Sequence, residues 1–152
     1  MKNKKALLII LISGLFLLLD QFLKWQAFHN WTDSKLIFPY FGWQLFLNSG
    51  LAFGLPLSNS ATIFLTLPMI GLIGYLFFKE LNKKNAATPK LLLAWSILLA
   101  GATSNLLDRI FYHLVIDYFI IGTAIINIGD ILIVSGLIIY LLDLKNKTQA
   151  AP

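Results

Sequence analysis

The chain has 152 residues, of which 58% are hydrophobic and only 12% are charged. Soluble domains carry about 25% charged residues, so this chain lacks the polar surface to cover a compact core in water. Its formal net charge of +5 does not indicate nucleic-acid binding, because nine of the twelve basic residues lie in three clusters beside apolar stretches, a pattern typical of membrane topology.

Apolar stretches of membrane-spanning length occur four times along the chain. Helices are expected over about 6–23, 61–78, 91–108 and 124–142. Nine Lys and Arg residues lie near the termini or between the second and third stretches, and three lie in the other connections. By the positive-inside rule, both termini and the connector after the second helix are expected in the cytoplasm. The remaining loops, and any site that they form, are then expected at the outer face.

The segment over about 36–56 is expected to form a β-rich structure outside the membrane. It carries no charge from Leu36 to Leu55, and the stretch from Trp43 to Asn48 is rich in strand-forming residues with partial alternation. An open sheet edge cannot lie in hydrocarbon, so the sheet is expected above the helices. The predicted fold class is an all-α membrane protein with one domain over 1–152, four transmembrane helices and a small extracytoplasmic β-sheet.

Polar residues interrupt the predicted helices near their outer ends. Spacings of three or four residues place the members of a group on one helix face, and the groups are Asp20 with Lys24, Asn105 with Asp108 and Arg109, and Asn127 with Asp130. A rise of about 1.5 Å per residue puts all three groups in the outer half of a hydrocarbon core about 30 Å thick. A charge at the centre of a span costs on the order of 2.5 to 3.5 kcal/mol. Three helices are therefore expected to converge on one polar layer.

The carboxylates of this layer divide into two kinds. The expected ion pairs, which would hold helices together, are Asp20 with Lys24 and Asp108 with Arg109 or a neighbouring backbone amide. Asp117 and Asp130 are left without a nearby cation. If these two carboxyl groups meet, like charges raise one pKa, so the pair shares one proton at neutral pH. One carboxylate can then take a proton from water while the neutral one polarises a carbonyl, which is the chemistry of an aspartic protease.

Amides and glycines in the same region leave two interpretations open. Asn48, Asn105 and Asn127 either satisfy backbone groups between helices or hold an extended peptide beside the carboxylates. Gly50 and Gly54 either form plain turns or let the backbone approach a ligand.

Other chemistries find little support in the sequence. Cysteine is absent, and His29 and His113 are isolated, so both histidines are expected at the membrane interface. No metal site and no cofactor are predicted. The serine-hydrolase motif Gly-x-Ser-x-Gly and the metalloprotease motif His-Glu-x-x-His are also lacking.

Five short blocks, in order and spacing, resemble the lipoprotein signal peptidases of bacteria, also called signal peptidase II. The resemblance extends from Lys4 to about Leu142. Any one block is weakly specific, whereas five in order on a chain with four apolar stretches are specific. The blocks are Asp20-Gln21-Phe22-Leu23-Lys24, Asn48-Ser49-Gly50-Leu51-Ala52-Phe53-Gly54, Gly101-Ala102-Thr103-Ser104-Asn105-Leu106-Leu107-Asp108-Arg109, Val115-Ile116-Asp117-Tyr118-Phe119 and Asn127-Ile128-Gly129-Asp130.

The resemblance implies an aspartyl endopeptidase of the bacterial cytoplasmic membrane, which cleaves prolipoproteins on the amino side of a diacylglyceryl-modified cysteine. It implies that Asp117 and Asp130 are the catalytic pair and that the outer sheet forms a cradle over them. The residues implied to bind substrate or support the pair are Asn48, Asn105, Arg109 and Asn127. The residues implied to shape the site are Asp20, Lys24, Asp108, Gly50, Phe53 and Gly54. Membrane lipids and globomycin-type inhibitors are the other implied partners, and a monomer that binds no nucleic acid is expected.

Some positions depart from the pattern of that family. Ser104 and His113 stand where the family commonly has glycine, and Leu51 stands where a small residue is usual. Ile126 and Gly129 replace a frequent aromatic residue and a frequent alanine. None of these changes removes a motif carboxylate, so they are expected to affect loop shape and substrate fit more than chemistry.

Two other classes of function fit parts of the pattern. A small proton or ion conductor would relay charge through the intramembrane aspartates, but the inner halves of the helices offer only Ser13, Ser96 and Ser135 as polar groups. A non-catalytic protein that binds lipoprotein precursors would explain the glycine departures, but it would not need two unpaired carboxylates.

Overall fold

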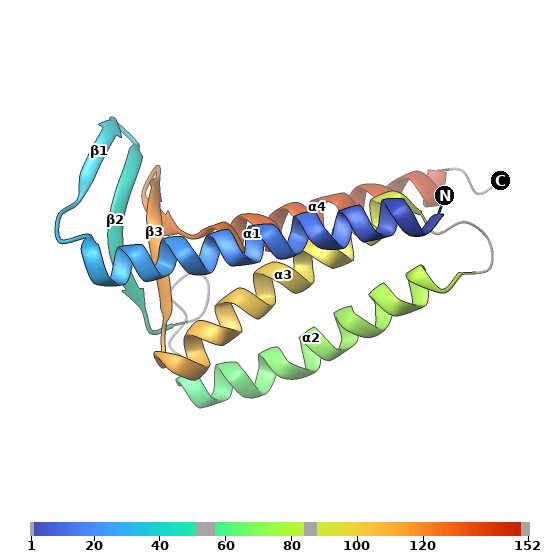
Figure 1. Ribbon diagram of the computed structural model, residues 1–152, viewed down its shortest axis with the longest axis horizontal. Coiled ribbons are helices and arrows are strands. Elements are labelled where there is room, and N and C mark those ends of the chain that lie inside the picture. Colours follow the sequence, from blue (N-terminus) through green and yellow to red (C-terminus); the bar gives the residue numbers. More distant parts are fainter. Residues whose placement is uncertain (1, 51–56, 84–87, 150–152) are drawn as a thin grey trace.

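Four long helices run side by side, and a small sheet covers one end of them in the computed structural model of the chain (Figure 1). The structure describes residues 2–50, 57–83 and 88–149. The helices are α1 (Lys2–Asn30), α2 (Asn59–Leu81), α3 (Pro89–Phe111) and α4 (Ile128–Gln149). The strands are β1 (Lys35–Phe38), β2 (Phe41–Asn48), β3 (Val115–Ile121) and β4 (Ala124–Ile126). The predicted site residues Phe53 and Gly54 lie outside the described residues, as does Leu51.

Among the described residues, three helices are long and apolar enough to cross a membrane, and they are α1 from Lys4, α2 and α3. The uncharged stretch of α4 covers only 131–142, between Asp130 and Asp143. At about 1.5 Å per residue, this stretch is shorter than a hydrocarbon core of about 30 Å. The structure therefore confirms four helices, whereas the fourth membrane crossing stays a prediction.

Helix α3 is the centre of the helical layer. Of its membrane-span window, 72% is buried, against 11% for α1 and for α2. It contacts all three other helices. It approaches α4 closely at Gly101, where an added Cβ would lie 2.3 Å from the carbonyl oxygen of Gly129. Large apolar side chains of the outer helices, such as Leu15 and Phe64, are exposed, as expected for surfaces that face lipid.

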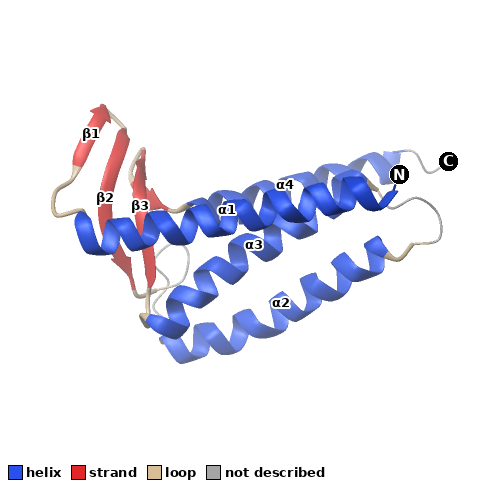
Figure 2. Cartoon of the chain, viewed as in Figure 1, coloured by secondary structure: helices blue, strands red, loops and turns tan. Residues whose placement is uncertain are grey.

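The sheet is antiparallel throughout, with the strand order β1-β2-β3-β4. Figure 2 shows it at the end of the helices opposite to both chain termini. In the register of β2 and β3, Asn48 faces Val115 and Phe46 faces Asp117. Asn48 and Asp117 are therefore diagonal neighbours on adjacent strands, within reach of each other's side chains.

Two of the predicted helix boundaries were wrong. The fourth helix was expected from residue 124, but 124–126 form β4 and the helix begins at Ile128; the first was expected to end at residue 23, but it continues to Asn30. The predicted β-rich segment at about 36–56 supplies β1 and β2, and the sheet also contains β3 and β4, which were not predicted. Short apolar stretches rich in isoleucine fit a strand as well as a helix, and here pairing of β3 with β2 and β4 decides for the strand.

The turn after α3 holds a residue in the left-handed region, where His113 has a φ of 62°. This conformation costs a residue with a side chain roughly 1 to 2 kcal/mol, while glycine pays about 0.5 to 1 kcal/mol in backbone entropy. We expect His113→Gly to raise the free energy of unfolding by about 0.5 to 1 kcal/mol, measured by thermal unfolding in detergent. His29→Gly, which places glycine in the last turn of α1, is the control and should not raise it. A destabilised His113→Gly protein would contradict this account.

Candidate active site

The start of α4 is closed by a reciprocal pair of hydrogen bonds between Asn127 and Asp130. The backbone N–H of Asp130 donates to Oδ1 of Asn127 at 2.8 Å, and the backbone N–H of Asn127 donates to Oδ2 of Asp130 at 3.3 Å. This is the pattern of a capping box, in which two unpaired N–H groups of the first turn are satisfied. Asp130 is thereby held at the positive end of the α4 dipole.

Asn127 also connects Asp130 to Asp117 on the neighbouring strand. Its side-chain Nδ2 donates to Oδ1 of Asp117 at 2.6 Å, and Nδ2 of Asn48 donates to the other oxygen, Oδ2, at 3.1 Å. Burial, followed by the negative charge of Asp130, raises the pKa of Asp117 to about 7. The two predicted carboxylates thus share one asparagine as a hydrogen-bond partner.

On the α3 side, Asn105 and Arg109 border the same pair. Asn105 Nδ2 donates to Oδ1 of Asp130 at 2.8 Å. Arg109 is 9% exposed, and among the described residues its guanidinium makes only long contacts, with the carbonyl oxygens of Asn105 at 3.5 Å and Gly50 at 3.4 Å. Within the described part of the chain, Arg109 makes no ion pair, so most of its donor capacity is available near the carboxylates.

Behind the pair lies a fully buried ion cluster centred on Lys24. Its ammonium group is 3.0 Å from Asp20 and 2.8 Å from Asp108, and it donates to Oδ1 of Asn105 at 2.8 Å. The predicted pair of Asp20 and Lys24 is confirmed. Asp108 was expected to pair with Arg109 or a backbone amide. It binds Lys24 and the N–H of Ile116 instead of Arg109, because consecutive residues of a helix do not face each other.

Three members of this cluster were missed in the sequence. Ser104 donates to Oδ2 of Asp20 at 2.6 Å, Tyr118 donates to its Oδ1 at 2.7 Å, and Gln21 donates to Oδ1 of Asp108 at 3.0 Å. Gln21 and Ser104 could have been found, since both are polar residues within apolar helices and Ser104 lies four residues before Asp108. Tyr118 gave no such signal, because tyrosine is common in strands.

Gly129 and Ser104, two of the departures from the family pattern, adjoin the same carboxylate. A Cβ at Gly129 would lie 2.9 Å from Oδ1 of Asn127, and 3.1 Å from both Oδ1 of Asn105 and Oδ2 of Asp20. The missing side chain therefore leaves room for polar groups of α1, of α3 and of the residue that precedes α4. The hydroxyl of Ser104 donates to Oδ2 of Asp20, the same oxygen that a Cβ at Gly129 would approach.

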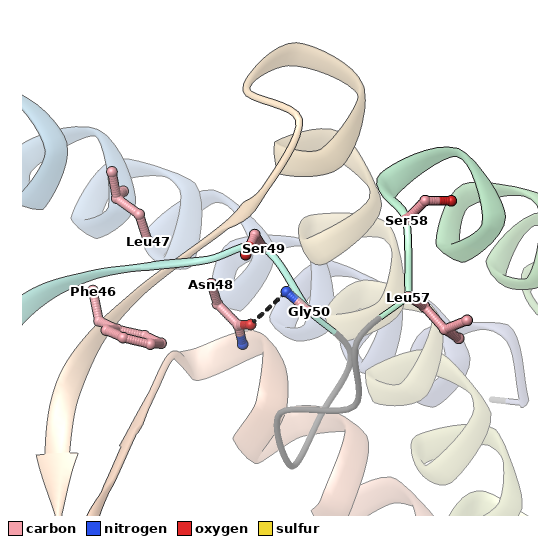
Figure 3. Close-up of a pocket in the computed structure, with 7 residues that line it drawn as sticks. All are labelled: Phe46, Leu47, Asn48, Ser49, Gly50, Leu57 and Ser58. Atoms are coloured by element: carbon pink, nitrogen blue, oxygen red, sulfur yellow. Dashed lines mark hydrogen bonds between the residues drawn. The ribbon is translucent and has the colours of Figure 1, made fainter.

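A cavity of about 510 Å³ opens beside Asn48, between the end of β2 and the start of α2 (Figure 3). Phe46 and Asn48 lie on one side of the β2 ribbon and Leu47 on the other, as the alternation of a strand requires (Figure 3). Oδ1 of Asn48 accepts the N–H of Gly50 at 3.1 Å, which leaves its Nδ2 directed at Asp117. The cavity is lined by Phe46, Leu47, Asn48, Ser49, Gly50, Leu57 and Ser58.

Together, the fold and the site define an integral membrane protein. It holds two carboxylates, both hydrogen-bonded to one asparagine, near the end of the helices that the sheet covers. The family described as Signal peptidase (SPase) II matches residues 12–145 of the chain. The chain therefore belongs to the signal peptidase II family, whose members are aspartic-type proteases.

Individual relatives are similar to this chain over nearly their whole length. The lipoprotein signal peptidase of Syntrophus aciditrophicus is 33% identical, over 96% of this chain and 98% of its own. That of Clostridioides difficile is 32% identical, over 94% of this chain and 100% of its own. A solved structure of a bacterial membrane enzyme, at 22% identity, shares the fold with a TM-score of 0.83 over 97% of this chain and 91% of that one.

Proposed function

We propose that this protein removes signal peptides from lipid-modified prolipoproteins by cleaving on the amino side of a diacylglyceryl-cysteine. Asp117 and Asp130 activate one water molecule for this hydrolysis. The observation that carries the proposal is the placement of Asn127, which hydrogen-bonds Asp117 through its side chain and Asp130 through its backbone. The names of its relatives support the same substrate class.

The two carboxyl groups divide the work. Asp130 accepts two N–H groups at a helix N-terminus, which favours its negative charge, so it takes a proton from water. Asp117, whose pKa is raised to about 7, carries the proton and polarises the scissile carbonyl. The hydroxide oxygen then adds to that carbonyl, and the proton taken by Asp130 passes to the leaving amine as the peptide bond breaks.

Hydrogen-bond donors around the pair position the substrate. Arg109, with no acidic partner among the described residues, and Asn48, at the rim of the cavity, donate to peptide carbonyls on either side of the scissile bond. Holding the peptide extended in this way lowers the entropic cost of the reaction. Arg109 donates a long hydrogen bond, at 3.4 Å, to the carbonyl oxygen of Gly50, which lines the cavity.

The membrane topology is part of the proposal. We place the protein in the bacterial cytoplasmic membrane as a monomer with four crossings, both termini in the cytoplasm, and the sheet and the carboxylates at the outer face. Support comes from the basic clusters and from both termini lying at the end of the helices opposite to the sheet (Figure 1). Acyl chains that anchor the substrate in the outer leaflet would then hold its scissile bond at the depth of Asp117 and Asp130.

Cleavage of a defined peptide tests this function. Purified protein in nanodiscs is incubated with a precursor peptide that carries a diacylglyceryl-cysteine, and the products are identified by mass spectrometry. We expect one cut before the modified cysteine, blocked by a globomycin-type peptide, and at most slow cleavage of the same peptide without lipid. Equal cleavage without lipid would contradict the substrate class. Binding without cleavage would favour a non-catalytic binder, and proton flux in proteoliposomes without cleavage would favour a conductor.

A further inference from the structure

Tyr118 connects the strand that carries Asp117 to the helix that carries Asp130. It is the next residue after Asp117 in β3, its side chain points to the opposite face, and it is completely buried. Its hydroxyl donates to Oδ1 of Asp20 at 2.7 Å and accepts the backbone N–H of Ile128, in the first turn of α4, at 3.2 Å. Burial and the charge of Asp20 raise the pKa of Tyr118, so the hydroxyl keeps its proton and donates it to the carboxylate.

Asp20 closes this link into a triangle. Its Oδ1 also accepts the N–H of Ile128, at 3.0 Å, so strand, helix and α1 meet at one carboxylate oxygen. Its other oxygen is held by Ser104 at 2.6 Å and Lys24 at 3.0 Å. Asp20 is thus anchored by buried groups of α1 and α3, whereas Asp117 and Asp130 belong to β3 and α4.

We propose that Tyr118 is a positioning residue that fixes the separation of Asp117 and Asp130. The pairing of β3 with β4 begins at Phe119 with Ile126 and continues away from the site. Between this pairing and the two carboxylates, β3 and the start of α4 are therefore joined by side chains, of which Asn127 is one. The Tyr118 hydroxyl joins β3 to the start of α4 on the face of the strand opposite to Asp117. Tyr118 is one residue after Asp117, and Ile128, whose N–H it accepts, is two residues before Asp130.

This role rests on the proposed function and has a consequence for the pH dependence of that reaction. The charged groups that face Asp117 are Asp130 from α4, Lys24 from α1 and Arg109 from α3. Burial and Asp130 raise the pKa of Asp117, against Lys24. If the two carboxylates separate, the charge of Asp130 acts less on Asp117 and its pKa falls. The protonated form that the reaction needs is then lost at a lower pH.

Tyr118→Phe isolates the hydroxyl, because the ring keeps its packing with Ala27 and Ile116 and Asp20 still binds Ile128. With the lipidated peptide in nanodiscs, we expect kcat to fall by roughly 10- to 100-fold, as for a small misplacement of reacting groups, with KM unchanged within about twofold. The alkaline limb of the pH profile should move to lower pH. Thermal unfolding measured on the same sample reports whether the variant is folded.

Two control variants separate this role from general loss of stability. Ser104→Ala removes a hydroxyl from the other oxygen of Asp20 without touching β3, so its alkaline limb should stay in place even if its stability falls. Tyr75→Phe removes a hydroxyl from an exposed ring of α2 and should match the unchanged protein in all readouts.

Three results would overturn the role of Tyr118. The first is a Tyr118→Phe enzyme with unchanged kcat and an unchanged alkaline limb, in the same assay in which Asp117→Asn is inactive. This result removes the positioning role and leaves the proposed function standing. The second is the same shift of the limb in Ser104→Ala, which assigns the effect to Asp20 alone. The third is an active Asp117→Asn enzyme, or no cleavage by the unchanged protein; either removes the proposed function and this role with it.

Discussion

Replacing either Asp117 or Asp130 by asparagine is expected to reduce cleavage of a lipidated precursor by about 10³-fold, within the range that general acid–base groups contribute. Asparagine keeps the shape of the side chain but can neither take a proton from water nor supply one to a carbonyl. Each substitution also places an amide where a carboxylate accepts hydrogen bonds from asparagines, so a small loss of stability should accompany the loss of activity. The measurement is the initial rate of peptide cleavage in nanodiscs, at equal amounts of inserted protein.

A matched control comes from an acidic residue outside the polar layer. Asp33 is exposed between α1 and β1, and its Oδ2 accepts a long hydrogen bond from Oγ1 of Thr32 at 3.4 Å. Asp33→Asn should therefore cleave at the unchanged rate. Near-normal turnover by Asp117→Asn or Asp130→Asn would eliminate the carboxylate pair as the source of activity.

The sequence predicted the helices and the polar layer because both follow from local rules. Long apolar stretches form membrane helices, and the spacing of four residues between Asp20 and Lys24 placed them on one face of α1, where they pair. The convergence of Asn105, Asn127 and Asp130 was also expected, since polar groups in an apolar helix avoid lipid by facing each other. Their roles in substrate binding and catalysis remain proposals.

What could not be predicted depends on contacts between distant segments. The apolar stretch from Val115 to Ile121 has no period that distinguishes a strand from a buried loop, and it becomes β3 by pairing with β2, about seventy residues earlier. Likewise, Asp108 is adjacent in sequence to Arg109, but α3 directs it toward Lys24 of α1. The place of Tyr118 followed only when both its strand and the start of α4 were known.

Lys24→Met is expected to lower the stability of the protein strongly. Lys24 is 1% exposed, and its one positive charge pairs with two carboxylates that are also buried, Asp20 and Asp108. Methionine fills a similar volume but leaves two negative charges close together without a cation. Removing one partner of a buried ion pair costs about 3 to 5 kcal/mol, which should be seen as a large drop in the unfolding temperature in detergent.

The cost of Lys24→Met should depend on the charge of Asp108, because the effect is the burial of unpaired carboxylates and not the loss of the lysine stem. Adding Asp108→Asn to Lys24→Met removes one of the two stranded charges, so the double variant should be less destabilised than the sum of the single variants, a coupling of up to about 3 kcal/mol. Lys79→Met, at an exposed position of α2, should change stability by less than about 0.5 kcal/mol. Strict additivity of Lys24→Met and Asp108→Asn would show that the ammonium does not neutralise Asp108.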